Sequence, residues 1–236
     1  MYQYHQERPT PHFLTDIAKG NMWDSRTLNL FGVNRTVGTD WETLWDDGGN
    51  YVYPTSALIM SAVSSSASDT MALLISGLDA NYNEITETVT LNGTSSVSTS
   101  ASFLRVNSAV ILAGSNVGNI TISNGGQTYS YITIGVGLAQ SSVYTVPAGH
   151  SIYIYRIDCT SGTTTGQKYI SLRNVTRTSS GRILRVAEST FSASVSFDRQ
   201  VPFRITEKTD FHFEAKSSSS TNEISIITEA LLIQDN

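Results

Sequence analysis

The segment Asp79-x-Asn81-x-Asn83 has the oxygen-ligand spacing with which a calcium-binding loop begins. Such a loop also needs a glycine at its sixth position, for a sharp turn, and a glutamate at its twelfth, which binds the ion through both carboxylate oxygens. This chain has Glu84 and Thr90 at those two positions. We therefore predict that the Asp and Asn side chains stabilise a hairpin turn and bind no metal.

Other residue types that carry catalysis lack the partners they would need. Cys159, the one cysteine, falls in an apolar strand pattern and is expected to be a packed thiol. The histidines have no ligand spacing and no cysteine partner, so zinc is not predicted; they are His5, His12, His150 and His212. No nucleophile-elbow, phosphate-loop or His-Glu-x-x-His motif occurs. A pair of carboxylates could still meet in three dimensions, as in a glycosidase. The sequence nevertheless favours a protein that is not an enzyme and has no cofactor.

The densest basic cluster consists of Arg173, Arg177, Arg182 and Arg185. A pI near 5.3 and the lack of lysines or interleaved aromatic residues argue against nucleic acid as its partner. Between Arg35 and Arg105 the sequence has no lysine or arginine and eight acidic residues. We expect the arginines to pair with carboxylates of an adjacent subunit. The alternative is that these charges are scattered over solvated faces.

Composition and turn signals predict that β-strands position these residues. Serine and threonine make up roughly a quarter of the 236 residues, well above average usage, and only 15% are charged. From Tyr51 onward, short alternating segments are separated by turn signals about every 8–12 residues, the spacing of a β-sandwich. Asn124-Gly125-Gly126-Gln127 is one such turn. We predict an all-β fold, a jelly-roll-like β-sandwich over residues 51–236, with at most a short helical turn near residues 14–19.

Residues 1–50 differ from the rest of the chain, and we expect them to form an extended N-terminal arm that packs on the body or on a neighbouring subunit. The two prolines of Pro9-Thr10-Pro11 disfavour helix there. Five aromatic residues are predicted to anchor this arm in an interface; they are Trp23, Trp41, Trp45, Tyr51 and Tyr53. We find no signal peptide and no apolar run long enough to span a membrane, so we expect folding in a reducing cytosol and no membrane partner.

Several strings along the chain resemble uncharacterised structural proteins of tailed bacteriophages, marine phages especially. They include Gly77-Leu78-Asp79 with Asn81-Tyr82-Asn83-Glu84, Tyr144-Thr145-Val146-Pro147-Ala148-Gly149, and the closing segment from Pro202 to Phe211. The resemblance covers most of the chain from about Trp23. It implies a virion structural protein that folds in the host cytoplasm before assembly, and it offers no catalytic residues.

From this resemblance we expect a capsid decoration or cement protein that forms a homo-oligomer, with a trimer favoured, and that contacts other virion proteins. Arm and loops would lie across neighbouring subunits, so that buried area stabilises the head. Two alternatives remain open. One is a neck or tail component, and the other is a receptor- or carbohydrate-binding module that uses paired tyrosines, Tyr129 with Tyr131 and Tyr153 with Tyr155.

Overall fold

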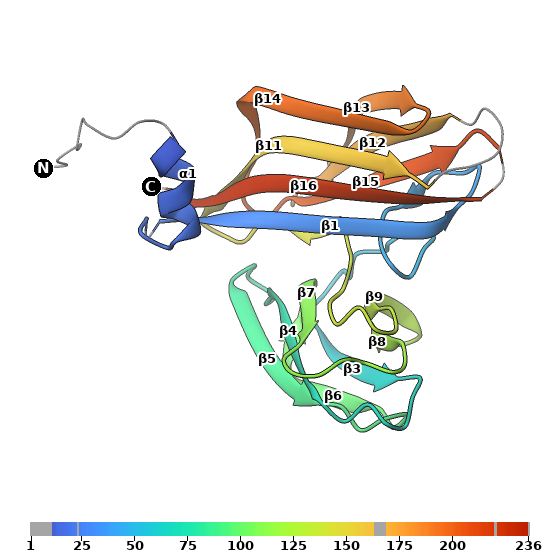
Figure 1. Cartoon of the computed structure of the whole chain (residues 1–236). Coiled ribbons are helices and arrows are strands. Elements are labelled where there is room, and N and C mark those ends of the chain that lie inside the picture. Colours follow the sequence, from blue (N-terminus) through green and yellow to red (C-terminus); the bar gives the residue numbers. More distant parts are fainter. Residues whose placement is uncertain (1–10, 23, 163–168, 220, 236) are drawn as a thin grey trace, which may run out of the picture.

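The computed structural model describes residues 11–22, 24–162, 169–219 and 221–235. Its antiparallel strands form two sandwiches that lie one above the other in Figure 1. The predicted all-β sandwich fold is confirmed. A short helix, α1 (Pro11–Ala18), lies beside the start of the first strand, close to the helical turn that the sequence indicates.

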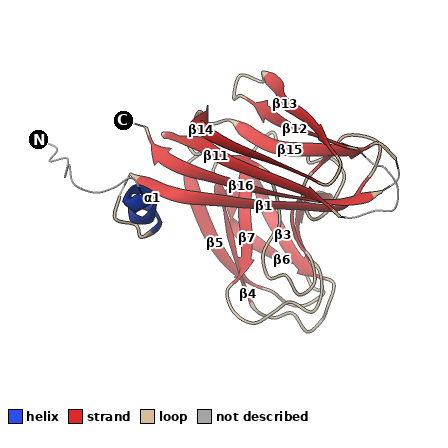
Figure 2. Cartoon of the chain, turned by 45° about the horizontal axis from the view of Figure 1, so that its top comes forward, coloured by secondary structure: helices blue, strands red, loops and turns tan. Residues whose placement is uncertain are grey.

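The strands of the first sandwich are β1 (Ser25–Val37), β2 (Glu42–Thr43), β10 (Tyr144–Thr145), β11 (His150–Ser161), β12 (Ile170–Arg177), β13 (Ile183–Phe191), β14 (Ser194–Ile205), β15 (Asp210–Ser217) and β16 (Asn222–Gln234). Those of the second are β3 (Leu58–Ser64), β4 (Ala72–Leu78), β5 (Glu84–Thr90), β6 (Val97–Phe103), β7 (Arg105–Ile111), β8 (Ile120–Asn124) and β9 (Gln127–Ile132). Figure 2 shows the long strands of the first sandwich crossing above the shorter ones of the second.

The first sandwich has the strand order of a jelly roll. Its sheets run β1-β16-β11-β14 and β10-β15-β12-β13. Counted in chain order within this sandwich, with β1 as first and β10 as second, these orders read 1-8-3-6 and 2-7-4-5. Two nested Greek keys of this kind define the jelly roll. The first apolar core fills the space between the two sheets, with residues such as Leu44, Ile152, Phe211 and Leu232 fully buried.

The second sandwich is inserted into the second strand of the jelly roll. Both β2 and β10 pair with the same edge of β15, Thr43 opposite Glu214 and Tyr144 opposite Phe211. The chain leaves this strand after Leu44 and returns at Ser142, whose N–H donates to the Leu44 carbonyl at 2.9 Å. The insertion therefore begins and ends at adjacent points, as inserted domains commonly do.

Within the insertion, the sheets β6-β3-β8-β9 and β5-β4-β7 enclose a second apolar core. The predicted hairpin is its β4–β5 pair. At the turn, the Asp79 carboxylate accepts the N–H groups of Asn81 and Asn83 at 2.8 and 2.9 Å, which confirms the role in turn formation expected for this segment. The predicted turn at Gly125-Gly126 joins β8 to β9, with both glycines at positive φ.

Cys159 lies on β11 inside the first core and is fully buried. Burial raises the pKa of its thiol to about 12. It is therefore the packed thiol that the sequence predicts.

The N-terminal segment differs from the predicted arm. Residues 25–37 form β1, which pairs with β16 along its length and buries Leu30, Val33 and Val37. Position 32 of this strand has room only for glycine. A Cβ there would lie 2.6 Å from the Leu44 carbonyl and 2.8 Å from the Ser142 Cβ. The two ends of the insertion pass over β1 at this glycine. Likewise, residues 51–236 are not one sandwich, since they hold the insertion and most of the jelly roll.

Deleting residues 1–45 is expected to abolish cooperative folding of the jelly roll, because it removes β1 and exposes the β16 edge. If residues 1–45 were a peripheral arm, the chain without them would still form a folded β-domain. Circular dichroism and thermal unfolding of the truncated chain distinguish the two outcomes. As point variants, Leu30→Ala should cost about 2–5 kcal/mol of unfolding free energy, and Phe31→Ala, 46% exposed on the same strand, well under 1 kcal/mol.

Candidate functional site

The polar groups at the junction of the two sandwiches come chiefly from one face of β15. Its side chains alternate, with Phe211, Phe213 and Ala215 in the first core. The intervening side chains, directed toward the insertion and the outer surface, are Asp210, His212, Glu214 and Lys216. Each of these four contacts a residue from another part of the chain, as follows.

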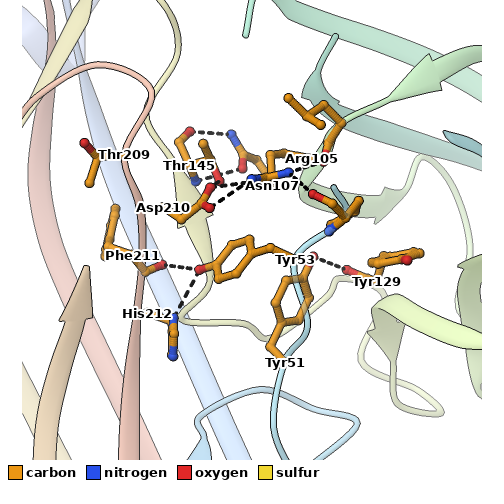
Figure 3. A network of polar contacts seen from close by, with 12 residues as sticks. Tyr51, Tyr53, Arg105, Asn107, Tyr129, Thr145, Thr209, Asp210, Phe211 and His212 are labelled. Atoms are coloured by element: carbon orange, nitrogen blue, oxygen red, sulfur yellow. Dashed lines mark hydrogen bonds and ion pairs between the residues drawn. The ribbon is translucent and has the colours of Figure 1, made fainter. Parts of the chain in front are cut away.

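Arg105 on β7 and Asp210 on β15 form a buried ion pair between the two sandwiches (Figure 3). The guanidinium Nε and Nη2 donate to the two carboxylate oxygens at 2.7 and 2.9 Å. Nη1 donates to the Pro54 and Leu104 carbonyls at 2.8 and 2.7 Å, and the Thr145 hydroxyl donates to Asp210 at 2.7 Å. The arginine is 6% and the aspartate 4% exposed, so both charges depend on these partners.

A second set of contacts runs along β15 from the insertion to Trp41. The Tyr53 hydroxyl lies 3.2 Å from the Phe211 carbonyl and 3.1 Å from His212 Nδ1, and burial raises its pKa well above the usual value. His212 Nε2 lies 3.2 Å from Glu214, which accepts from Arg173 at 2.7 Å. The Arg173 guanidinium stacks on the Trp41 ring at 3.9 Å, and Lys216 lies 4.7 Å from the same ring. Of these contacts, those of Tyr53 join the insertion to the jelly roll, as the Arg105–Asp210 pair does.

A cleft of about 380 Å³ opens beside these contacts, on the outer face of β12, β13 and β15. It brings together six of the nine predicted interface residues, namely Trp41, Tyr51, Tyr53, Arg173, Arg177 and Arg185. Arg177 and Arg185 are exposed, and within the described residues neither they nor Arg182 form an ion pair with an acidic side chain. The rim of this cleft is therefore positively charged.

The predicted aromatic anchors lie mainly inside the chain. Trp45, Tyr51 and Tyr53 are between 3% and 8% exposed and belong to the second core, with Trp45 and Tyr51 in edge-to-face contact at 5.0 Å. Trp41 is half-buried beneath Arg173, and Trp23 lies outside the described residues. Arg173 is already paired with Glu214.

The acidic segment between Arg35 and Arg105 is also largely satisfied within the chain. Asp46 pairs with Arg35 and Glu84 with Arg26. Backbone N–H groups bind Glu42, Asp69, Asp79 and Glu87. Asp40 and Asp47 are exposed, and among the described residues their carboxylates form no hydrogen bond or ion pair. The charge asymmetry of the sequence therefore does not correspond to one free acidic face.

Sequence reasoning missed Arg105, Asn107, Thr145 and Asp210, which together link the insertion to the jelly roll. Asn107 exchanges two hydrogen bonds with the Thr145 backbone, at 2.9 and 3.0 Å. The available signal was the alternation Asp210-Phe211-His212-Phe213-Glu214, which places three ionisable groups on one face of a strand. Arg105 gives no such signal, because its partner is 105 residues away.

The paired tyrosines differ in exposure. Tyr129 is buried in the second core, so it does not form a surface strip with Tyr131. Tyr153 and Tyr155 are half-buried on β11, and the Arg204 guanidinium lies 5.9 Å from the Tyr153 ring. Among the residues described, we find no cluster of three or more metal-ligating side chains, and no helix with the length and apolarity that crossing a membrane requires.

Stability is expected to fall in acid because of Glu214 and Asp69. Burial alone raises their pKa values, but hydrogen bonds from His212 and Arg173 to Glu214, and from Ser64, Val117 and Gly118 to Asp69, lower both overall. A carboxyl whose pKa is lower when folded stabilises the fold above its unfolded pKa, about 4, and loses this contribution as pH falls through the folded pKa. Urea unfolding should therefore give a constant free energy from pH 7 to about 5 and a decreasing one below. Asp69→Asn should flatten this decrease, and the exposed Asp47→Asn should not.

The fold and the junction define an eight-position jelly roll that carries a second β-sandwich inside its second strand. No family model matches the sequence, and no curated protein matches it. Among solved structures, a chain in the structure of infectious bursal disease virus, Gx strain, is 11% identical to this protein. The match covers 89% of this chain and 72% of the viral chain, with a TM-score of 0.27. The VP2 subviral particle of the same virus is 11% identical over 90% and 77%, with a TM-score of 0.23. This similarity to a viral capsid protein is weak.

Proposed function

We propose that this chain is a structural protein of a tailed-phage virion that decorates or cements the capsid as a homo-oligomer, with a trimer favoured. The observation that supports this most is the jelly-roll strand order combined with an inserted sandwich that a buried ion pair joins to it. Jelly rolls build viral capsid and lectin domains. Buried contacts between the two lobes would reduce the conformational freedom that the chain loses when it joins a particle. The phage assignment itself rests on the sequence resemblance.

The arginine-lined rim is the surface we assign to the contact with a neighbouring virion protein. Arg177, Arg182 and Arg185 are exposed on β12, β13 and the turn between them. Val52 and Ile183, which line the same cleft, are exposed apolar residues, 54% and 41%. Guanidinium groups next to apolar side chains suit a partner segment that carries carboxylates. Because the acids at positions 42–87 are mostly bound internally, we expect those carboxylates to come from a different protein.

A binding assay on virions or capsids that lack this protein tests the proposal. We expect the recombinant chain to bind at saturating, countable sites, and the double variant Arg177→Glu/Arg185→Glu to bind at least about tenfold more weakly. A control with the same charge change away from the rim, Lys19→Glu/Arg199→Glu, should bind as the native chain does, because Arg199 is exposed on β14 in the opposite sheet. Absence of binding by the native chain would contradict a decoration role. Equal loss in both double variants would contradict the assigned surface.

A further inference from the structure

A second opening lies between the two sheets of the jelly roll, at the edge formed by β13 and β14. These are the outermost strands of their sheets, at the top of Figure 1. The space measures about 420 Å³, within the range of small-molecule sites. Both sheets contribute apolar walls, with Ile154, Ile157 and Phe197 from one and Leu172, Val186 and Phe213 from the other.

Two bulges at the same level of the sandwich accompany this opening. On β14, residues 199–202 stand opposite Tyr155 alone, because Asp198 pairs with Arg156 and Phe203 with Ile154. On β13, residues 187–188 stand opposite Arg173 alone. Ala187 adopts φ +55°, which costs energy in a residue with a side chain. Residues of both bulges line the space, so the two edges depart from regular pairing where the sheets are open.

The lining also contains a buried amide oxygen that is unpaired among the described residues. Asn174 is 5% exposed, and its Nδ2 donates to the His212 carbonyl at 3.3 Å. This bond fixes the orientation of the amide, and its Oδ1 is then left without a hydrogen-bond partner in the part of the chain that the structure describes. An unsatisfied buried acceptor is unfavourable, and a donor supplied by a ligand would remove that cost. Apolar walls with one buried, unpaired acceptor suit an apolar molecule that carries a single hydroxyl.

We propose that this space binds a small amphiphile, with its unbranched alkyl chain between the two sheets and its hydroxyl donating to Asn174 Oδ1. The apolar walls would exclude a compact polar ligand such as a sugar. Opposite charges at the edge, Glu188 and Arg199, leave no net charge there to select an ionic head group. This site is separate from the arginine-lined cleft, on the other side of the β12–β13 sheet, so it does not depend on the function proposed above.

Titration calorimetry of the full chain with 1-decanol, paired with decyl methyl ether, tests the proposal. The ether has the same alkyl chain and no donor. We expect saturable one-to-one binding of decanol, about fivefold tighter than the ether, the effect of one hydrogen bond. In Asn174→Leu, the alcohol and the ether should bind equally. Absence of saturable decanol binding would overturn the site, and equal binding of both probes by the native chain would overturn the role of Asn174.

A cavity-filling variant locates the binding. Val186→Trp adds bulk inside the space and should abolish decanol binding, whereas Val201→Trp adds the same bulk at a 79% exposed position of β14 and should leave it unchanged. If Val186→Trp binds decanol as tightly as the native chain, the ligand lies elsewhere and the proposal fails. Should that variant not fold, the alcohol–ether comparison on the native chain and on Asn174→Leu still decides.

Discussion

Replacing Arg105 with Met is expected to lower the free energy of unfolding by about 3–5 kcal/mol, because Asp210 is then left as a buried charge without its partner. The same change leaves the Pro54 and Leu104 carbonyls without their donor. Urea unfolding at neutral pH gives the value. Because Arg105 joins the two sandwiches, we also expect the transition to become less cooperative, with the insertion and the jelly roll unfolding separately.

A double-mutant cycle separates the ion pair from the other contacts of these residues. Arg105→Met combined with Asp210→Leu removes both charges, so its cost should be smaller than the sum of the single variants by about 1–3 kcal/mol. The pair Arg26–Glu84 offers a matched control, since it also joins the two sandwiches but is exposed, 52% and 40%. Arg26→Met should cost no more than about 1 kcal/mol. Equal costs for Arg26→Met and Arg105→Met would contradict the role of burial at the junction.

Gly77→Ala is expected to be among the most destabilising single substitutions, at about 3 kcal/mol or more. Gly77 lies on β4 between β5 and β7, and a Cβ there would sit 2.0 Å from the Arg105 carbonyl and 2.9 Å from the Phe103 ring. The backbone of β7 would have to move away, which displaces Arg105 from Asp210.

Ser76→Ala, at the neighbouring position of β4, provides the control and should change stability by less than about 0.5 kcal/mol. If Gly77→Ala acts through Arg105, its effect should be smaller when introduced into the Arg105→Met background. Additive effects of the two substitutions would contradict this coupling. Thermal and urea unfolding of the native chain, Gly77→Ala, Arg105→Met and the double variant provide the comparison.

Features set by neighbouring residues could be predicted from the sequence. The β4–β5 hairpin and the turn at Gly125-Gly126 follow from Asx side chains and from glycines that accept positive φ. The buried thiol of Cys159 follows from its apolar strand. These signals extend over a few residues, so no knowledge of the rest of the fold is needed to interpret them.

The insertion could not be predicted, because β2 and β10 are two residues each and too short to show any alternation. The segment before Tyr51 therefore looked like an arm, although β1 is a paired strand of the jelly roll. Aromatic residues such as Trp45 and Tyr53 are common both in cores and in interfaces, so their presence in the sequence does not tell the two apart. The junction depends on partners more than a hundred residues apart, such as Arg105 and Asp210, which only the folded chain brings together.

Quantitative mass spectrometry of purified virions, scaled to the major capsid protein, tests the proposed virion role most directly. We predict about one copy per capsid subunit or per few subunits, because a decoration or cement protein repeats with the capsid lattice. A handful of copies per particle would place the chain in the neck or tail and contradict the decoration role. Absence of the chain from the particle would contradict the proposed function as a whole.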